Sequence, residues 1–205
     1  MIKIIDYGMG NLRSVQKSLE GVGYKAEITS DPDKVKKASG VILPGVGAFA
    51  DAIDNLKSGG MADAVKHIVK EGKPLLGICL GMQLLMTVSE ENGLYDGLGV
   101  IEGQVLKIPS QQTRSTLKVP HMGWNAVTIN TEHRLISGIE DNSYFYFVHS
   151  YYVKPDNEKY IVTNTNYGID YCSVIAKDNV MGIQFHPEKS SSLGQKILKN
   201  FGEMI

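Results

Sequence analysis

The stretch that decides the fold is Pro74-Leu75-Leu76-Gly77-Ile78-Cys79-Leu80-Gly81, which leads into a predicted helix at residues 82–88. Residues 74–78 carry no polar side chain, and strands of this kind are buried on both faces, as in parallel sheets. Glycine stands two residues before and two after Cys79, where a Cβ would obstruct a tight strand-to-helix turn. We therefore predict a nucleophile elbow that projects the Cys79 thiol at a helix N-terminus, where the helix dipole favours the thiolate.

Strands and helices alternate around this turn in the first half of the chain. We predict strands at residues 2–5, 24–29 and 41–43, and helices at residues 11–21, from residue 30 onward, and in segments up to residue 70. This order, with short and fully apolar strands, predicts an α/β fold: a doubly wound, mostly parallel, flavodoxin-like sheet flanked by helices.

The pattern changes after about residue 95, where strand-like segments follow one another with short, turn-rich connections. They lie at residues 100–108, 144–152, 159–165, 171–176 and 180–185. We expect antiparallel strands that either extend the same sheet or form a second small sheet over it. An amphipathic helix at residues 192–204 closes the chain. Because no linker or repeat interrupts the sequence, we predict a single domain spanning residues 1–205.

The best candidate for a base that activates the thiol is His186. It ends an apolar strand and is followed by Pro187 and Glu188, whereas His67 and His133 lie in polar surroundings typical of the surface. Proline keeps His186 extended, and residues i and i+2 of an extended chain point to the same side. A Glu188 carboxylate that accepts from one imidazole nitrogen leaves the other free to take the thiol proton. Alone, this pattern fits equally well an ordinary histidine at a strand end beside a surface glutamate. Together with the predicted elbow, it favours a catalytic triad of Cys79, His186 and Glu188.

The loop Pro44-Gly45-Val46-Gly47-Ala48-Phe49-Ala50 follows a predicted strand and fits the G-x-G-x-x-A pattern of dinucleotide-binding loops. It belongs to the third strand rather than the first, and no acidic residue follows at the proper distance, so we expect neither a dinucleotide nor another cofactor. We interpret the loop as backbone beside the thiol, with a Val46 or Gly47 N–H as the second donor to an oxyanion. The Leu80 N–H, directly after the nucleophile, is the first donor.

Composition and charge disfavour several other classes. The net charge is −1 with acidic and basic residues interspersed, whereas nucleic-acid binding needs clustered Lys and Arg. The two cysteines, Cys79 and Cys172, cannot build a metal cluster by themselves and do not indicate a secreted disulfide scaffold. No apolar run approaches the roughly twenty residues of a membrane span, and no signal peptide is visible. We expect a soluble cytoplasmic protein without a metal.

Two motifs taken together, at residues 77–83 (Gly-Ile-Cys-Leu-Gly-Met-Gln) and 184–188 (Gln-Phe-His-Pro-Glu), resemble the signature of class I (triad-type) glutamine amidotransferases. The resemblance covers the whole chain. It implies that Cys79 attacks the side-chain amide of L-glutamine and releases ammonia, and that the glutamyl thioester is then hydrolysed to glutamate. His186 is the implied base and Glu188 the residue that orients it, and no cofactor takes part.

The motifs at residues 6–11, 120–125 and 146–151, together with Pro-Gly-Val-Gly at residues 44–47, resemble one branch of this family. Members of that branch serve histidine biosynthesis as glutaminase subunits. The resemblance implies a heterodimer with a (β/α)8 cyclase subunit, which receives the ammonia through an internal channel. It also implies a nearly idle free glutaminase, in which the Gly45–Val46 peptide must reorient before the second oxyanion donor is available.

The same resemblance implies further roles. We expect a substrate-binding group of Gln83, His149, Ser150 and Tyr151. Trp124 is the only tryptophan and lies in a predicted exposed turn. An exposed tryptophan is a typical interface anchor, so we expect Trp124 to face the cyclase together with Asn11 and Lys189.

Several alternatives stay open at this point. The nearest is a glutaminase of the same family that serves another acceptor, in anthranilate, carbamoyl phosphate or surface amino-sugar synthesis. A cysteine peptidase on the same fold is more distant, since it lacks the His-Pro-Glu motif found at residues 186–188. A catalytically inactive binding subunit is disfavoured by the intact Cys79, His186 and Glu188.

Overall fold

Strand β4 (Leu75–Cys79) lies in the parallel part of the sheet and is buried along its whole length. The computed structural model describes residues 1–112 and 115–205. In it β4 pairs in parallel with β3 (Gly40–Gly45) on one side and with β15 (Val180–Ile183) on the other. Neither the faces nor the edges of β4 meet water, and its apolar sequence suits that position.

Two further parallel strands complete this half of the sheet. β1 (Ile2–Ile5) pairs with β3, and β2 (Ala26–Thr29) pairs with β1, so the parallel order is β2-β1-β3-β4-β15. Because β2 and β3 lie on opposite sides of β1, right-handed connections place their helices on opposite faces of the sheet. The predicted doubly wound, mostly parallel core is confirmed.

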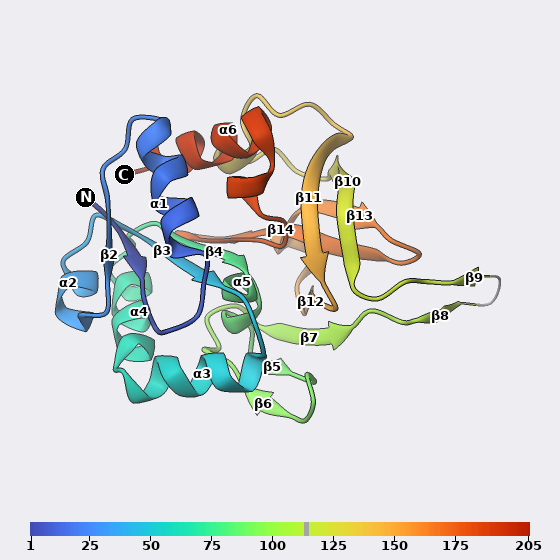
Figure 1. Cartoon of the computed structure of the whole chain (residues 1–205), viewed down its shortest axis with the longest axis horizontal. Helices are drawn as coiled ribbons and strands as arrows, with labels where there is room; N and C mark the ends of the chain where they lie inside the picture. The colour runs from blue at the N-terminus through green and yellow to red at the C-terminus, as the bar shows by residue number, and fades with distance from the viewer. Residues whose placement is uncertain (113–114) are drawn as a thin grey trace.

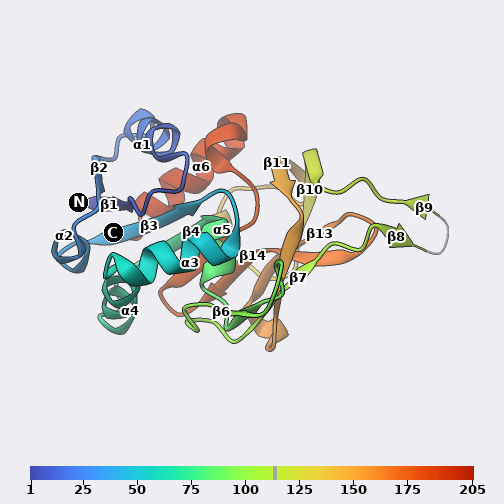
Figure 2. The same ribbon diagram turned by 60° about the horizontal axis from the view of Figure 1, so that its bottom comes forward.

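Helices cover both faces of this core (Figures 1 and 2). On one face lie α1 (Leu12–Gly21) and α6 (Ser191–Gly202), which bury Leu19 and Phe201 against the sheet. The other face is covered by α2 (Pro32–Lys36), α3 (Phe49–Ser58), α4 (Met61–Lys70) and α5 (Leu80–Leu84). Within residues 1–112 and 115–205, no helix has the length and apolar character needed to cross a membrane.

Strands of the second half extend the same sheet beyond β15, mostly antiparallel. In order they are β14 (Asp170–Lys177), β12 (Tyr151–Pro155), β7 (Gly103–Lys107), β5 (Val88–Ser89) and β6 (Tyr95–Asp96). A branch leaves β14 through β13 (Ile161–Asn166), β10 (His121–Ile129) and β11 (Ser143–His149). Of the two arrangements expected for this half, extension of the same sheet is the one observed.

The remaining elements are short. The pair β8 (Gln111–Gln112) and β9 (Ser115–Thr116) extends away from the body of the protein (Figure 2). Single 3-10 turns lie in the connections: η1 (Arg134–Ile136), η2 (Glu158–Tyr160) and η3 (Pro187–Lys189). Of these, η3 matters most for function, because it follows directly from His186.

Three predictions made from local sequence are wrong. The predicted helix 82–88 ends at Leu84, because Val88 and Ser89 form β5 and pair with β6 and β7. The predicted strand 144–152 is two strands, β11 and β12, which separate at Ser150 because they pair with different neighbours. Trp124 lies inside β10 rather than in a turn, opposite a residue of β11. The other expected elements are present, with ends that differ by a few residues.

The turn after β4 leaves no room for a side chain at Gly81, where a Cβ would lie 1.8 Å from the Leu43 carbonyl oxygen. We expect Gly81→Ala to lower the free energy of unfolding by about 3 kcal/mol, because the backbone of β3 has to move. Gly21→Ala at the end of α1 is the control, since a Cβ there meets no atom within 4 Å. Urea unfolding followed by circular dichroism measures both variants, and equal stabilities would contradict the packing argument.

Candidate active site

The backbone makes a strained turn at Cys79, where β4 passes into α5. Cys79 has φ 54° and ψ −111°, a conformation that residues with a side chain rarely adopt. A Cβ at Gly77 would lie 2.7 Å from the carbonyl oxygen of Gly81, so glycine lets the strand and helix backbones touch. The predicted elbow is therefore present, and it places the thiol at the start of a helix.

The Cys79 sulfur is nearly buried and has polar neighbours. Gln184 Nε2 donates a hydrogen bond to Sγ at 3.7 Å, and the carbonyl oxygen of Val148 lies 3.9 Å from Sγ. These contacts leave the sulfur at the centre of a polar site within an apolar core. No role for Gln184 was expected from the sequence. The sequence feature that points to Gln184 is a polar residue near the end of an otherwise apolar predicted strand. In the structure the Gln184 side chain is fully buried.

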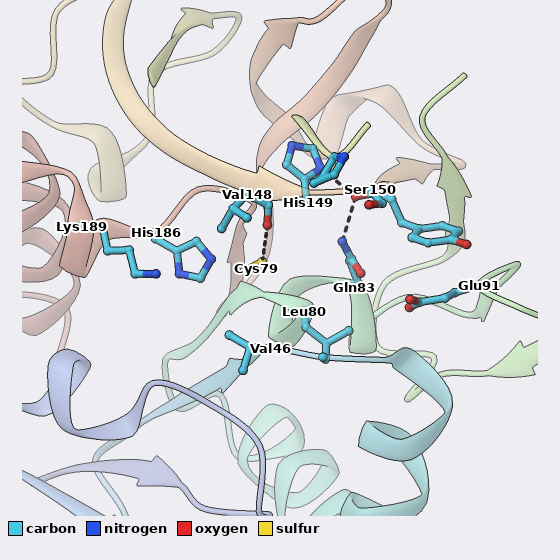
Figure 3. Close-up of a pocket in the computed structure, with 13 residues that line it drawn as sticks. Val46, Cys79, Leu80, Gln83, Glu91, Val148, His149, Ser150, His186 and Lys189 are labelled. Carbon is cyan, nitrogen blue, oxygen red and sulfur yellow. Dashed lines mark hydrogen bonds between the residues drawn. The ribbon is translucent and has the colours of Figure 1, made fainter. Parts of the chain in front are cut away.

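His186 and Glu188 form a hydrogen-bonded pair beside the thiol. His186 Nδ1 donates to Glu188 Oε1 at 2.8 Å, and both side chains are almost fully buried. His186 Nε2 has no hydrogen-bond partner within the described part of the chain, and Figure 3 shows the imidazole next to Cys79. Burial lowers the pKa of His186, but the Cys79 sulfur and the Glu188 carboxylate raise it to about 10. At neutral pH this pKa favours an imidazolium, which lies beside the Cys79 sulfur.

A pocket of about 350 Å³ opens at this turn (Figure 3). Its lining includes the residues expected to form the oxyanion site or to bind substrate: Val46, Gly47, Leu80, Gln83, His149, Ser150 and Tyr151. Cys79, His186 and Lys189 line it as well, whereas Glu188 reaches it only through its hydrogen bond to His186. Asn11 and Trp124 are not part of the lining.

The two expected sources of oxyanion donors meet at the ends of β3 and β4. Gly45 is the register partner of Cys79 in this parallel pair. Val46 follows Gly45 as Leu80 follows Cys79, and both line the pocket. The Leu80 N–H belongs to the first turn of α5, where backbone N–H groups have no partner within the helix. This geometry can hold a negatively charged oxygen next to the Cys79 sulfur.

Two of the expected substrate-binding residues have side chains that are occupied within the protein. Gln83 Nε2 donates to the Tyr151 carbonyl oxygen at 2.9 Å and to Gln184 Oε1 at 3.2 Å. His149 Nδ1 lies 2.8 Å from the same Tyr151 oxygen, and its Nε2 lies 3.1 Å from the Tyr171 hydroxyl. Burial lowers the pKa of His149 to about 3, so the ring is neutral and Nδ1 carries the proton that it donates. Both side chains therefore position the pocket wall at Tyr151.

An acidic side chain that was not expected, Glu91, also lines the pocket. Its Oε2 accepts from the Phe49 N–H at 2.9 Å, and burial raises the pKa of the carboxyl. Lys189 lies on the opposite side of Cys79 (Figure 3). A carboxyl at one side of the pocket and an ammonium at the other suit a small zwitterion. In the sequence Glu91 stands in the polar run 89–92, where nothing distinguishes it from a surface residue.

Of the residues expected to face a partner, Lys189 lines the pocket, and Trp124 and Asn11 are linked to it through neighbouring elements. Lys189 lines the pocket and places Nζ 5.9 Å from the centre of the Tyr146 ring. Trp124 is 51% exposed and contacts the same Tyr146 edge-on. Asn11 precedes α1, which packs against η3, the element that carries Lys189. An exposed tryptophan beside a tyrosine and a basic residue has the composition of a protein-binding surface.

Comparison with known proteins identifies close relatives. A family model described as "Glutamine amidotransferase class-I" matches residues 3–204. The chain is 53% identical over 205 residues to imidazole glycerol phosphate synthase subunit HisH of Geobacter sulfurreducens. The match covers 99% of this chain and 98% of the relative. It is 52% identical over 205 residues to the protein of the same name from Methanosarcina barkeri, again with 99% and 98% covered.

Solved structures share the fold at much lower identity. A crystal structure of a glutamine amidotransferase has a TM-score of 0.76 at 18% identity and covers 99% of this chain and 97% of that chain. The structure of PurLQS from Thermotoga maritima has a TM-score of 0.72 at 16% identity and covers 100% and 96%. These structures establish the likeness of fold. By the match of the family model over residues 3–204 and by its full-length relatives, the chain belongs to the class-I glutamine amidotransferase family.

Proposed function

We propose that this chain is the glutaminase subunit of an imidazole glycerol phosphate synthase, which hydrolyses L-glutamine and passes the ammonia to a cyclase subunit. The observation that carries the proposal is a pocket in which Cys79 and His186 meet, with Glu188 hydrogen-bonded to the imidazole. The acceptor reaction, in histidine biosynthesis, is inferred from the 53% identical relative that is named as this subunit.

Acylation begins from the thiolate and the imidazolium. The Cys79 sulfur attacks the carbonyl carbon of the glutamine side-chain amide, and the electron pair of the C=O bond moves to oxygen. The Leu80 N–H and a second N–H, from Val46 or Gly47, stabilise this oxyanion. His186 Nε2, which has no other partner among the described residues, gives its proton to the amide nitrogen as the C–N bond breaks. Ammonia leaves, and a glutamyl thioester remains on Cys79.

Hydrolysis of the thioester uses the same groups. Neutral His186 takes a proton from a water molecule, and the resulting hydroxide attacks the thioester carbonyl carbon. The C–S bond then breaks, which releases glutamate and restores the thiolate beside the imidazolium. Glu188 keeps His186 in the required orientation through the 2.8 Å hydrogen bond to Nδ1, and Nε2 stays directed at the reacting atoms.

Glu91 is the group best suited to the α-ammonium of glutamine. Among the described residues that line the pocket, it is the one acid, and its position across from Lys189 leaves Cys79 between them (Figure 3). The Phe49 N–H occupies Oε2, so Oε1 remains for a ligand. The neighbouring wall is fixed, because two side chains hold the Tyr151 carbonyl oxygen.

The partner surface is an apolar stripe on β10 and β11, formed by Met122, Trp124, Tyr144 and Tyr146. Met122 and Tyr144 are 62% and 57% exposed, and the strand register places Trp124 opposite Tyr146. The stripe ends at Val148, which lines the pocket and whose carbonyl oxygen lies 3.9 Å from the catalytic sulfur. A cyclase bound on this stripe covers exposed apolar surface and receives the ammonia where it forms.

Replacement of the nucleophile tests the proposed reaction. We expect Cys79→Ser to lower kcat for glutamate release by about a thousandfold or more, because a serine hydroxyl is a far weaker nucleophile without a stronger base. Cys172→Ala is the matched control, since Cys172 is the other cysteine and is not part of the pocket lining. Glutamate release is measured with and without the cyclase and its nucleotide ligand. Near-normal turnover of Cys79→Ser would contradict the mechanism, and activity unaffected by the partner would contradict the coupled subunit.

The pH dependence tests the role of Glu188. Its carboxylate raises the pKa of His186, so the imidazolium persists until the pH approaches about 10. We expect Glu188→Gln to lower this pKa and to move the alkaline fall of kcat/KM to lower pH by at least about one pH unit. Glutamate release measured across the pH range gives both profiles, with the exposed Glu132→Gln as control. If the alkaline fall of kcat/KM occurs at the same pH in Glu188→Gln, Glu188 does not raise the pKa of His186 and is not part of the proposed triad.

The proposed partner surface is tested at Trp124. We expect Trp124→Ala to weaken the Kd for the cyclase by about tenfold or more, because buried tryptophans dominate interface energetics. Leu94→Ala is the matched control, since Leu94 is 77% exposed and lies outside the stripe. Isothermal titration calorimetry measures both affinities. A Kd that is the same for Trp124→Ala and the unsubstituted chain would show that the cyclase docks elsewhere.

A further inference from the structure

The hydroxyl of Tyr7 reaches the start of the proposed oxyanion loop, residues 44–47. Tyr7 follows β1, and the ladder between β1 and β3 ends at the pair Ile4 and Ile42. The Pro44 carbonyl lies beyond this ladder, and its oxygen accepts a hydrogen bond from the Tyr7 hydroxyl at 2.9 Å. Tyr7 is 7% exposed, so the bond is shielded from water. On the side of the loop that faces β1, the Pro44 carbonyl is therefore held by the Tyr7 side chain and not by strand pairing.

The phenol also fills the space beside Gly45. A Cβ at Gly45 would lie 2.5 Å from the Tyr7 hydroxyl oxygen and 2.9 Å from the Leu80 Cβ. Tyr7 and Leu80 thus both pack against the Gly45 α-carbon. The Tyr7 hydroxyl is located where the oxyanion loop meets the start of α5, the two segments that supply the proposed donors.

The residues after Tyr7 continue this contact along the loop. A Cβ at Gly10 would lie 3.4 Å from the Pro44 ring, and a Cβ at Gly47 would lie 2.6 Å from Met9 Cε. Residues 7–10 therefore back the loop from its first residue to its last. Val46, between these contacts, remains 43% exposed. The loop is supported from behind and open toward the pocket and solvent.

Tyr7 keeps its proton in this position. Burial raises the pKa of Tyr7, and the negative charge of Cys79 raises it further. The hydroxyl is consequently a permanent donor at the pH at which the enzyme works, and it is unsuited to act as a general acid or base. The Tyr7 hydroxyl can instead fix the position of the Pro44 carbonyl, to which it donates.

We propose that Tyr7 is a positioning residue of the glutaminase reaction, whose hydroxyl fixes the Pro44 carbonyl and so anchors the loop from which a Val46 or Gly47 N–H reaches the oxyanion. This role deepens the proposed function and rests on it. An anchored loop reduces the reorganisation that its donors need when the oxyanion forms. The oxyanion forms in the transition state and is absent from bound glutamine. Loss of the hydroxyl therefore lowers kcat and leaves KM little changed.

Tyr7→Phe removes the hydroxyl and keeps the ring. Two reactions of Cys79 separate positioning from folding. In acylation by p-nitrophenyl acetate, the sulfur displaces p-nitrophenolate through an oxyanion; in alkylation by iodoacetamide, it displaces iodide without one. We expect the acylation rate constant to fall about tenfold and the alkylation rate constant to change by less than about twofold.

Two variants serve as controls. Cys79→Ser gives the background rate of other nucleophiles with the ester. Tyr24→Phe removes the hydroxyl of a tyrosine whose ring packs against Gly202 and is not part of the pocket lining. We expect its rate constants to equal those of the unsubstituted chain. Equal losses of acylation and alkylation in Tyr7→Phe, or an acylation rate that is unchanged or higher, would overturn the positioning role.

Glutamine hydrolysis provides the second readout. For Tyr7→Phe we expect a kcat about tenfold lower and a KM within about twofold of the unsubstituted chain. A KM that rises while kcat is retained would overturn the proposal, because it would place Tyr7 in substrate binding. If the unsubstituted chain hydrolyses no glutamine with its partner, the proposed function fails, whereas the ester reaction still decides the role of Tyr7.

Discussion

The close approach of β3 and α5 at the turn after Cys79 is the constraint on which the rest of the site depends. There the Gly81 α-carbon lies so near the Leu43 carbonyl oxygen that no Cβ fits between them. This packing holds Cys79 at a φ of 54°, a strained value that persists only when the surrounding structure determines it. The Cys79 thiol, the proposed nucleophile, is thus positioned by backbone contacts within a buried core.

Parallel register then brings the other groups to the sulfur. With Cys79 beside Gly45 in β3, and Ile78 beside Ile183 in β15, the three strands end at the same edge of the sheet. Residues that follow parallel strands meet at that edge, as they do in other α/β folds. His186 arrives in this way from a segment more than a hundred residues from the nucleophile. A positive charge on this buried imidazole is tolerated because the Cys79 sulfur and the Glu188 carboxylate both raise its pKa.

The parts of the site that depend on short sequence separations could be predicted from the sequence. The glycines two residues to either side of Cys79 predict the tight turn, and the carboxylate two residues after His186 predicts their hydrogen bond. Both predictions need only the local sequence. Long-range strand pairing is not encoded in this way. Glu91 enters the pocket because β5 joins the distant sheet edge at β7. The His149 ring is held in place because the Tyr171 hydroxyl of β14 donates a hydrogen bond to its Nε2. The sequence predicts a turn at Trp124 for the same reason, since only its pairing with β11 reveals the strand.

The pocket has two walls that are held in different ways, and this difference bears on how a partner can control the enzyme. At Tyr151, hydrogen bonds from the buried side chains of Gln83 and His149 converge on one carbonyl oxygen, which makes that wall rigid. The proposed oxyanion loop is supported by Tyr7 from behind, but it exposes Val46, which lines the pocket. A protein docked over the apolar stripe can therefore press on the loop far more easily than on the substrate wall. Because the loop matters only once the oxyanion forms, such contact acts on turnover rather than on glutamine affinity.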